Sequence, residues 1–172
     1  MQQNRRQFIR NSSFLMALSS IKASGLKDWA VLPRRRVALI GTGWYGKSDL
    51  FRLMQVAPID IVGLCDVDKN QVQEAAQLIS ARLGSKTKTP LYGDYRKLLA
   101  DQKPEIVLIG SPDHWHALQA IDAVQSGAHV YLQKPISVDV SEGEAVVAAA
   151  RKYNRVIQVG TQRRSTPHLI EA

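Results

Sequence analysis

Three glycines at fixed spacing constrain the fold of this chain more than any other feature of its sequence. They lie in Gly41–Gly46, which reads G-T-G-W-Y-G. A short apolar run, Arg36–Ile40, precedes this loop, and residues 45–56 carry apolar side chains near helical spacing. A glycine-rich turn between a buried strand and a helix is typical of the first unit of a parallel α/β sheet.

The same turn indicates a binding site for a dinucleotide. Gly41 permits a tight turn, Gly43 lets a pyrophosphate approach the backbone, and Gly46 lets the helix pack closely against the strand. Free N–H groups at the start of the helix would bind the phosphates. Trp44 and Tyr45 either cover the pyrophosphate or only pack at the helix start, and a turn without ligand is the alternative for the whole loop. The candidate cofactor contacts here are Gly41, Thr42, Gly43, Trp44, Tyr45 and Gly46.

An acidic residue stands where a ribose would be recognised. Asp66 follows a second apolar run, Ile59–Cys65, and comes 20 residues after Gly46. At this spacing an acidic side chain accepts hydrogen bonds from the ribose hydroxyls of a dinucleotide. Its charge would repel a 2′-phosphate, so we expect NAD rather than NADP as cofactor. Asp68 is the alternative, although its place before the next helix fits helix capping better.

Downstream, strand-like and helix-like patterns alternate. The polar segment 85–93 contains Pro90 and is expected to be a connection, and Ser141 with Glu144 has the spacing of a capping box. The alternation predicts an α/β fold of the Rossmann type, a doubly wound parallel sheet with six strands in the order 3-2-1-4-5-6. The expected helices cover 45–56, 68–83, 94–100, 113–127 and 141–154. The pattern assigns residues to five of the six strands, at 36–40, 59–65, 105–110, 128–132 and 156–159.

Charge and composition exclude several classes of protein. The formal net charge is +8, but residues 1–36 hold eight basic residues and one acidic residue, which accounts for +7. The body is nearly neutral, whereas a nucleic-acid-binding domain carries its basic excess on the folded surface, so we expect no nucleic-acid partner. The single cysteine, Cys65, excludes a disulfide framework. The longest apolar run, Ala145–Ala150, falls far short of the roughly 20 residues that a transmembrane helix needs.

The first 25 residues have the order of a bacterial export signal: basic, then apolar, then small. Arg5 and Arg6 with the following Phe8–Arg10 resemble a twin-arginine signal, which predicts the export machinery as a partner and a periplasmic or exported location. Cleavage is expected after Ala23 or Gly25, and residues 26–35 would be a basic linker. A basic arm without a targeting role is the alternative.

Four further motifs carry a family resemblance. They are the segments Cys65–Asp68, Ser111–His116, Gln133–Pro135 and Val159–Arg164. With the glycine loop they resemble the Gfo/Idh/MocA oxidoreductases, over roughly residues 36–170. The resemblance implies a nucleotide-binding domain over residues 36–164, with 165–172 beginning the link to a second α/β domain that this chain lacks. It also implies that the full-length protein forms a homo-oligomer.

The resemblance assigns the catalytic role to Lys134. In relatives the lysine of an E-K-P motif lies beside the nicotinamide and the reacting hydroxyl, where a cation stabilises charge as the proton leaves. This sequence carries Gln133 where the motif has glutamate, which removes one charge beside the lysine. A cis peptide before Pro135 is expected, because an X–Pro bond adopts cis at a cost of only about 0.5–1 kcal/mol.

The remaining candidates lie in two turns. Ser111, Pro112, His114 and His116 occupy a strand-to-helix turn that faces the cofactor crevice. A metal site of the two histidines is not expected, because residues two apart on a helix do not share a face. From the last strand and the motif around the lysine we add Gln133, Gln162 and Arg163, the last two of which would touch the nicotinamide half or the substrate.

These expectations combine into one leading function and two alternatives. The leading function is an NAD-dependent oxidoreductase domain that acts on a sugar, cyclitol or related polyol by hydride transfer. The first alternative is an NAD-using glycosidase or lyase that works by transient oxidation. The second is a nucleotide-binding fragment without catalysis. We expect the chain alone to be inactive, because relatives keep another acid/base group in their second domain.

Overall fold

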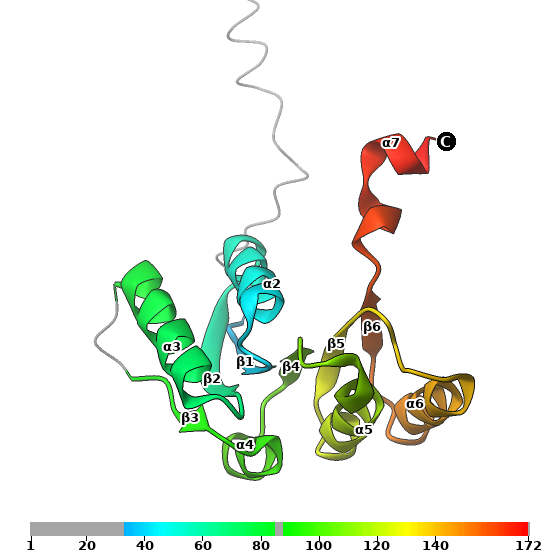
Figure 1. Cartoon of the computed structure of the whole chain (residues 1–172), viewed down its shortest axis with the longest axis horizontal. Helices are drawn as coiled ribbons and strands as arrows, with labels where there is room; N and C mark the ends of the chain where they lie inside the picture. Colours follow the sequence, from blue (N-terminus) through cyan, green and yellow to red (C-terminus); the bar gives the residue numbers. More distant parts are fainter. Residues whose placement is uncertain (1–32, 85–87, 172) are drawn as a thin grey trace, which may run out of the picture. The chain divides into compact units, whose positions relative to one another are not determined.

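Six parallel strands form a single sheet in the order β3-β2-β1-β4-β5-β6 (Figure 1), which confirms the predicted α/β class and strand order. This computed structural model describes residues 33–84 and 88–171, so the predicted export signal, its cleavage sites and most of the basic linker lie outside the described residues. The strands are β1 (Arg35–Ile40), β2 (Ile59–Cys65), β3 (Leu91–Tyr92), β4 (Ile106–Ile109), β5 (His129–Gln133) and β6 (Ile157–Gly160).

Helices connect the strands and cover both faces of the sheet. They are α2 (Trp44–Val56), α3 (Lys69–Leu83), α4 (Tyr95–Gln102), α5 (His116–Gln125), α6 (Val140–Lys152) and α7 (Pro167–Ile170), with short 3₁₀ turns at η2 (Asp113–Trp115) and η3 (Gln162–Ser165). In Figure 1, α2 and α3 lie on one side of the sheet and α4, α5 and α6 on the other. Among the residues that the structure describes, every helix is too short or too polar to span a lipid bilayer.

The alternation of side chains along β1 explains the two layers. Val37 and Leu39 are buried in one cluster with residues of α2 and α3, whereas Ala38 and Ile40 belong to a second cluster with α4, α5 and α6. Successive side chains of a strand point to opposite faces, so a strand that is apolar at every position needs cover on both sides. The doubly wound arrangement follows from this run of four buried residues.

Two expected features are corrected by the structure. The segment predicted as a polar connection contains β3, whose two residues pair with Leu64 and Cys65 of β2. A two-residue edge strand has no apolar periodicity, so the sequence pattern did not show it. The helix predicted to begin at residue 113 instead starts with the 3₁₀ turn η2 and becomes α-helical only at His116.

The start of α6 is also corrected. The cap is Asp139, whose carboxylate accepts a hydrogen bond of 2.8 Å from the Glu142 N–H, and not Ser141. The Ser141 hydroxyl donates to the same Asp139 oxygen, and the Glu142 carboxylate accepts a hydrogen bond of 3.2 Å from the Val138 N–H. The capping pair is therefore Asp139 with Glu142, two residues earlier than Ser141 with Glu144. The Glu142 N–H first, and then the Ser141 hydroxyl, lower the pKa of Asp139.

We predict that Asp139→Ala lowers the melting temperature at neutral pH more than Ser141→Ala does. A lowered pKa in the folded state means that the ionised cap stabilises the fold above the unfolded pKa of about 4 and loses this effect as pH falls through the folded pKa. The difference from the parent should therefore shrink in acid. Asp139→Asn, which caps without titrating, is the control. Equal melting temperatures for Asp139→Ala and the parent at pH 7 would contradict the assignment.

Candidate cofactor site

A cavity of about 680 Å³ opens at the carboxyl ends of β1, β2 and β4. In parallel α/β sheets this edge, where the strand order reverses, is where ligands bind. Of the residues predicted from sequence, five line the cavity: Gly41, Gly43, Asp66, Ser111 and Pro112. Residues from the turn after β3 and from the start of α5 complete its wall, so segments far apart in the sequence meet around one space.

Glycine is needed at the three positions of the loop for different structural reasons. Gly41 has a φ of +85°, and a Cβ there would lie 2.5 Å from the backbone of Gly110. At Gly46 a Cβ would lie 2.0 Å from the carbonyl oxygen of Gly41. Gly46 is therefore required where α2 packs against the end of β1, and Gly41 is required by its positive φ and by the close approach of the backbone after β4. A Cβ at Gly43, in contrast, would meet nothing within 4 Å, so only a ligand in the cavity would need that space.

Gly43 also caps α2 without a side chain. The helix therefore begins with no side-chain acceptor for its first N–H groups. Such groups, together with the positive end of the helix dipole, favour a bound phosphate. The open space at Gly43, the uncapped helix start and the cavity beside them fit the pyrophosphate of a dinucleotide.

Asp66 lies at the end of β2, beside the loop. One carboxylate oxygen accepts hydrogen bonds from the Thr42 N–H at 2.7 Å and the Thr42 hydroxyl at 3.0 Å, and the other accepts from the Asp68 N–H at 3.0 Å. These bonds hold the carboxylate at the cavity wall with further lone pairs available to ribose hydroxyls. The Asp68 carboxylate accepts a hydrogen bond from the Asn70 N–H and caps α3, as helix capping predicts for this residue. Thr42 is fully buried and acts on the cavity through Asp66.

Several cavity residues were not identified from the sequence. Tyr95 and Arg96 begin α4, with the Arg96 guanidinium 4.5 Å from the centre of the Tyr95 ring. The Tyr95 hydroxyl donates to Asp122 at 2.7 Å, and burial together with this bond raises the pKa of Tyr95. Their only sequence signal is the position after β3, a strand that the pattern did not reveal. The other lining residues that were not predicted are Ile40, Cys65, Val67, Gln71, Gly93, Asp94, Gly110, Trp115 and Gln119.

Cys65 contributes a neutral thiol to the wall. Burial first, and then the charges of Asp66 and Asp94, raise the pKa of Cys65 to about 12. The thiol is therefore protonated at neutral pH and is a poor nucleophile. Its place beside the cavity is one of apolar packing, and we assign it no chemistry.

The two histidines of the turn after β4 occupy different places. His114 is exposed, with its ring 6.1 Å from that of Trp115. His116 is buried, with its two ring nitrogens 2.6 Å from the Pro135 carbonyl oxygen and 2.9 Å from that of Ser111. It thus connects the turn after β4 to the turn after β5. Contact of either histidine with the cofactor stays a prediction. Among the described residues no group of three acidic, His or Cys side chains is placed to hold a metal.

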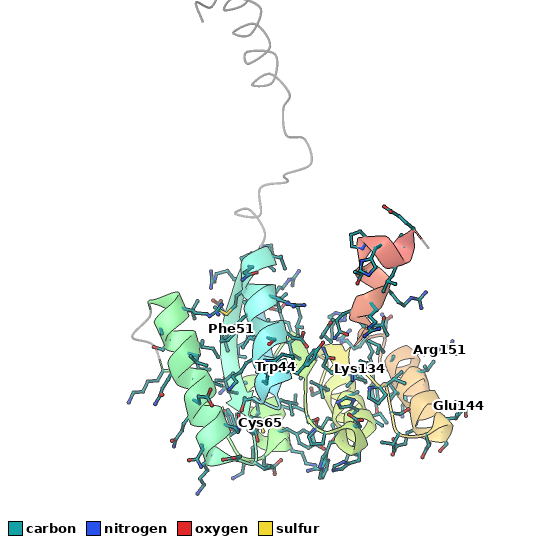
Figure 2. The ribbon with its side chains drawn as sticks, turned by 45° about the horizontal axis from the view of Figure 1, so that its top comes forward. Trp44, Phe51, Cys65, Lys134, Glu144 and Arg151 are labelled. Atoms are coloured by element: carbon teal, nitrogen blue, oxygen red, sulfur yellow. The ribbon has the colours of Figure 1, made fainter. Side chains whose placement is uncertain are left out.

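A second group of predicted residues gathers where β5 and β6 end. The Lys134–Pro135 peptide is cis, as predicted. Lys134 is exposed on this turn, and Figure 2 labels it together with Trp44 at the start of α2. Gln133 is buried and its amide oxygen accepts a hydrogen bond of 3.0 Å from Gln162. Trp44 and Arg163 are exposed, and Tyr45 holds the Trp44 ring edge-to-face at 5.0 Å.

A second hollow of about 690 Å³ lies along the start of α6. Its walls are the turn 136–139 and one side of α6, including Glu144 and Arg151, which Figure 2 labels. It contains none of the predicted site residues and lies away from the glycine loop. We therefore place the candidate site in the cavity at the carboxyl ends of the strands.

Comparison with known proteins decides the family. The sequence profile of the Gfo/Idh/MocA group, described as an oxidoreductase family with an NAD-binding Rossmann fold, matches residues 35–161. The chain belongs to this family. Its cofactor is accordingly NAD, and the cavity that the glycine loop and Asp66 border is the candidate site for it.

Relatives with different named activities share this domain. Inositol 2-dehydrogenase from Salmonella typhimurium is 28% identical over 131 residues, which cover 75% of this chain and 37% of that protein. Glycosyl hydrolase family 109 protein 1 from Akkermansia muciniphila is 27% identical over 115 residues, which cover 64% of this chain and 24% of that protein. The chain thus spans about a quarter to somewhat over a third of the length of these curated relatives.

Solved structures agree on the fold. The WlbA dehydrogenase from Bordetella pertussis, determined in complex with NADH and UDP-GlcNAcA, matches with a TM-score of 0.68 at 24% identity. The match covers 81% of this chain and 40% of that one. At this identity the likeness establishes the Rossmann-type fold.

The different roles of the glycines give a matched pair of variants. We predict that Gly43→Ala raises the Kd for NAD at least roughly tenfold, equivalent to about 1.4 kcal/mol, and leaves the free energy of unfolding nearly unchanged. Gly46→Ala should instead lower the free energy of unfolding by about 1–3 kcal/mol, because its methyl group would overlap the Gly41 carbonyl. Calorimetric titration and urea denaturation measure the two effects. Unaltered NAD binding by Gly43→Ala would exclude the loop as the phosphate site.

Proposed function

We propose that this chain is the NAD-binding part of an oxidoreductase that removes hydride from a hydroxyl-bearing carbon of a sugar, cyclitol or related polyol. The observation that carries the proposal is the location of Lys134 at the same edge of the sheet as the glycine loop. The names of the relatives support the substrate class: one is an inositol 2-dehydrogenase, and another is a glycosyl hydrolase family 109 protein.

Different residues would act at the two ends of the cofactor. The first N–H groups of α2 would bind the pyrophosphate, and Asp66 would accept hydrogen bonds from the adenosine ribose. Lys134, which directly follows β5, would donate a hydrogen bond to the reacting hydroxyl and stabilise its oxygen as the proton leaves. Bound NAD supplies the acceptor for the hydride.

A second candidate function keeps the same cofactor site. The glycosyl hydrolase relative favours an enzyme that oxidises its sugar only transiently, cleaves the glycosidic bond by elimination, adds water to the double bond so formed and then reduces the carbonyl group again. The two functions differ in the balance of reducing equivalents. Net oxidation accumulates NADH in proportion to product, whereas transient oxidation releases product with no accumulated NADH.

We predict that the protein made from its complete gene converts a sugar or cyclitol, and that Lys134→Ala lowers kcat by roughly 100-fold, within the usual range for loss of a group that assists proton transfer. The Kd for NAD should change little, because Asp66 and the glycine loop hold the other end. Screening of polyols and glycosides for NADH absorbance and for released product distinguishes the two candidate functions.

The matched control is Lys152→Ala, which removes an exposed lysine from the last turn of α6. That variant should keep the parent's kcat. A fall in NAD affinity with unchanged kcat in Lys134→Ala would contradict the proposed role. We expect no turnover when residues 33–172 are tested alone, because the relatives are much longer proteins than this chain.

We also propose that residues 1–25 direct export through the twin-arginine route. This route carries folded proteins, which suits a protein that must bind its nucleotide in the cytoplasm. We predict that replacing Arg5 and Arg6 together by lysine keeps the protein in the cytoplasmic fraction, whereas Lys27→Gln, outside the signal, does not. Cell fractionation and immunoblotting measure the distribution, and export of the double-lysine variant at the parent level would refute the proposal.

A further inference from the structure

Gln133 is the residue at which this sequence departs from the E-K-P motif, and the structure shows what it contacts. Its amide nitrogen donates a short hydrogen bond to the carboxylate of Asp49, which lies on α2, 84 residues earlier in the chain. Its amide oxygen accepts from the Gln162 side chain at 3.0 Å and from the backbone N–H of Lys134 at 3.3 Å. One buried amide thus connects α2, η3 and the backbone of the proposed catalytic lysine.

The carboxylate fixes the direction of this amide. An ionised carboxylate only accepts hydrogen bonds, so Gln133 must present its nitrogen to Asp49. The oxygen then faces the opposite way, toward Gln162 and the Lys134 N–H. The amide also packs beside Gly160, where a Cβ would lie 2.9 Å from both the Gln133 amide nitrogen and the Tyr131 hydroxyl oxygen.

We propose that Asp49 is a positioning residue for Lys134 that acts through Gln133, and that position 133 is glutamine because it faces Asp49. The role given to Lys134 rests on the function proposed above. The contacts among Asp49, Gln133 and Gln162 do not depend on it. Deletion of the Asp49 carboxylate would free the amide to turn over, which would remove the acceptor from the Lys134 N–H.

The charges around Asp49 explain why glutamate does not fit at position 133. Burial raises the pKa of Asp49, although the Gln133 bond and the charge of Arg52 act in the opposite direction. Arg52 lies on the same helix, while Tyr131 of β5 and Tyr45 of α2 face the same region and bring no positive charge. A glutamate at 133 would place a second carboxylate against the first, and two carboxylates that share a site cannot both ionise without cost.

The test is a charge swap. Gln133→Glu creates the carboxylate pair, and the double variant Asp49→Asn with Gln133→Glu restores one donor facing one carboxylate. Asp49→Ala removes the acceptor, and Asp49→Asn keeps an oxygen that can accept. Measurements on the 172-residue chain are the melting temperature from pH 5 to pH 8, the hydrogen-exchange rate of the Lys134 amide, and the Kd for NAD. The complete protein adds kcat.

We expect Gln133→Glu to lower the melting temperature at pH 8 and to recover toward pH 5, where the pair holds a shared proton. Exchange at the Lys134 amide should accelerate roughly tenfold in Asp49→Ala, as expected for loss of one hydrogen bond of ordinary net strength. In the complete protein, kcat should fall in Asp49→Ala. The double variant Asp49→Asn with Gln133→Glu should have a kcat near that of the parent. The Kd for NAD should stay within about twofold of the parent, which is a change of less than about 0.5 kcal/mol. The reason is that Asp66 and the glycine loop would hold the other end of the cofactor.

Three outcomes would overturn the proposal. The first is a melting temperature of Gln133→Glu that matches the parent at every pH. The second is a double variant no better than Gln133→Glu, and the third is unaltered Lys134 exchange and kcat in Asp49→Ala despite a lowered melting temperature. Absence of NAD binding by the parent would instead refute the proposed function, while the melting temperatures and the exchange rates would still test the action of Asp49 on Lys134.

Discussion

Three backbone segments lie in direct contact: the end of β1, the start of α2 and the end of β4. A Cβ at Gly46 would overlap the Gly41 carbonyl oxygen, one at Gly41 would overlap the Gly110 carbonyl group, and one at Gly110 would lie 3.0 Å from the Gly46 Cα. Close-packed interiors do not yield easily to an added methyl group. This three-way contact brings the first turn of α2 down to the sheet edge, and both the cavity and the Asp49–Gln133 contact depend on where α2 lies.

Buried polar side chains then hold the loops of that edge in place. Asp66 bonds to the glycine loop through Thr42, Gln119 accepts from the Ser111 hydroxyl at 2.6 Å, and His116 spans the turns after β4 and β5. Among the described residues, no buried side-chain nitrogen or oxygen lacks a partner. A satisfied polar network in a low-dielectric interior is rigid, which a site that must hold a cofactor in one orientation requires. The chemistry is thus placed on loops that are fixed by contacts beneath them.

Features that depend on neighbouring residues could be predicted from the sequence. The glycine loop, the end of β2 at Asp66 and the cap at Asp68 were all identified, because each is defined by a few residues in a row. Prediction was weaker where two local patterns compete. Ser141 with Glu144 and Asp139 with Glu142 have the same capping spacing, and only the backbone at Asp139, with φ −142° and ψ 173°, decides that the helix starts after it.

The sequence by itself therefore determined the α/β class, the strand order and the cofactor loop, because strand and helix periods and glycine spacing are properties of short segments. Only the tertiary structure decided which side chains share the site. Tyr95 and Trp115 line the cavity, and His116 is buried in the interior. Gln133 donates a hydrogen bond to Asp49 at the sheet edge. Such partners lie tens of residues apart, and a hydrogen bond between two single side chains leaves no periodic trace in either segment.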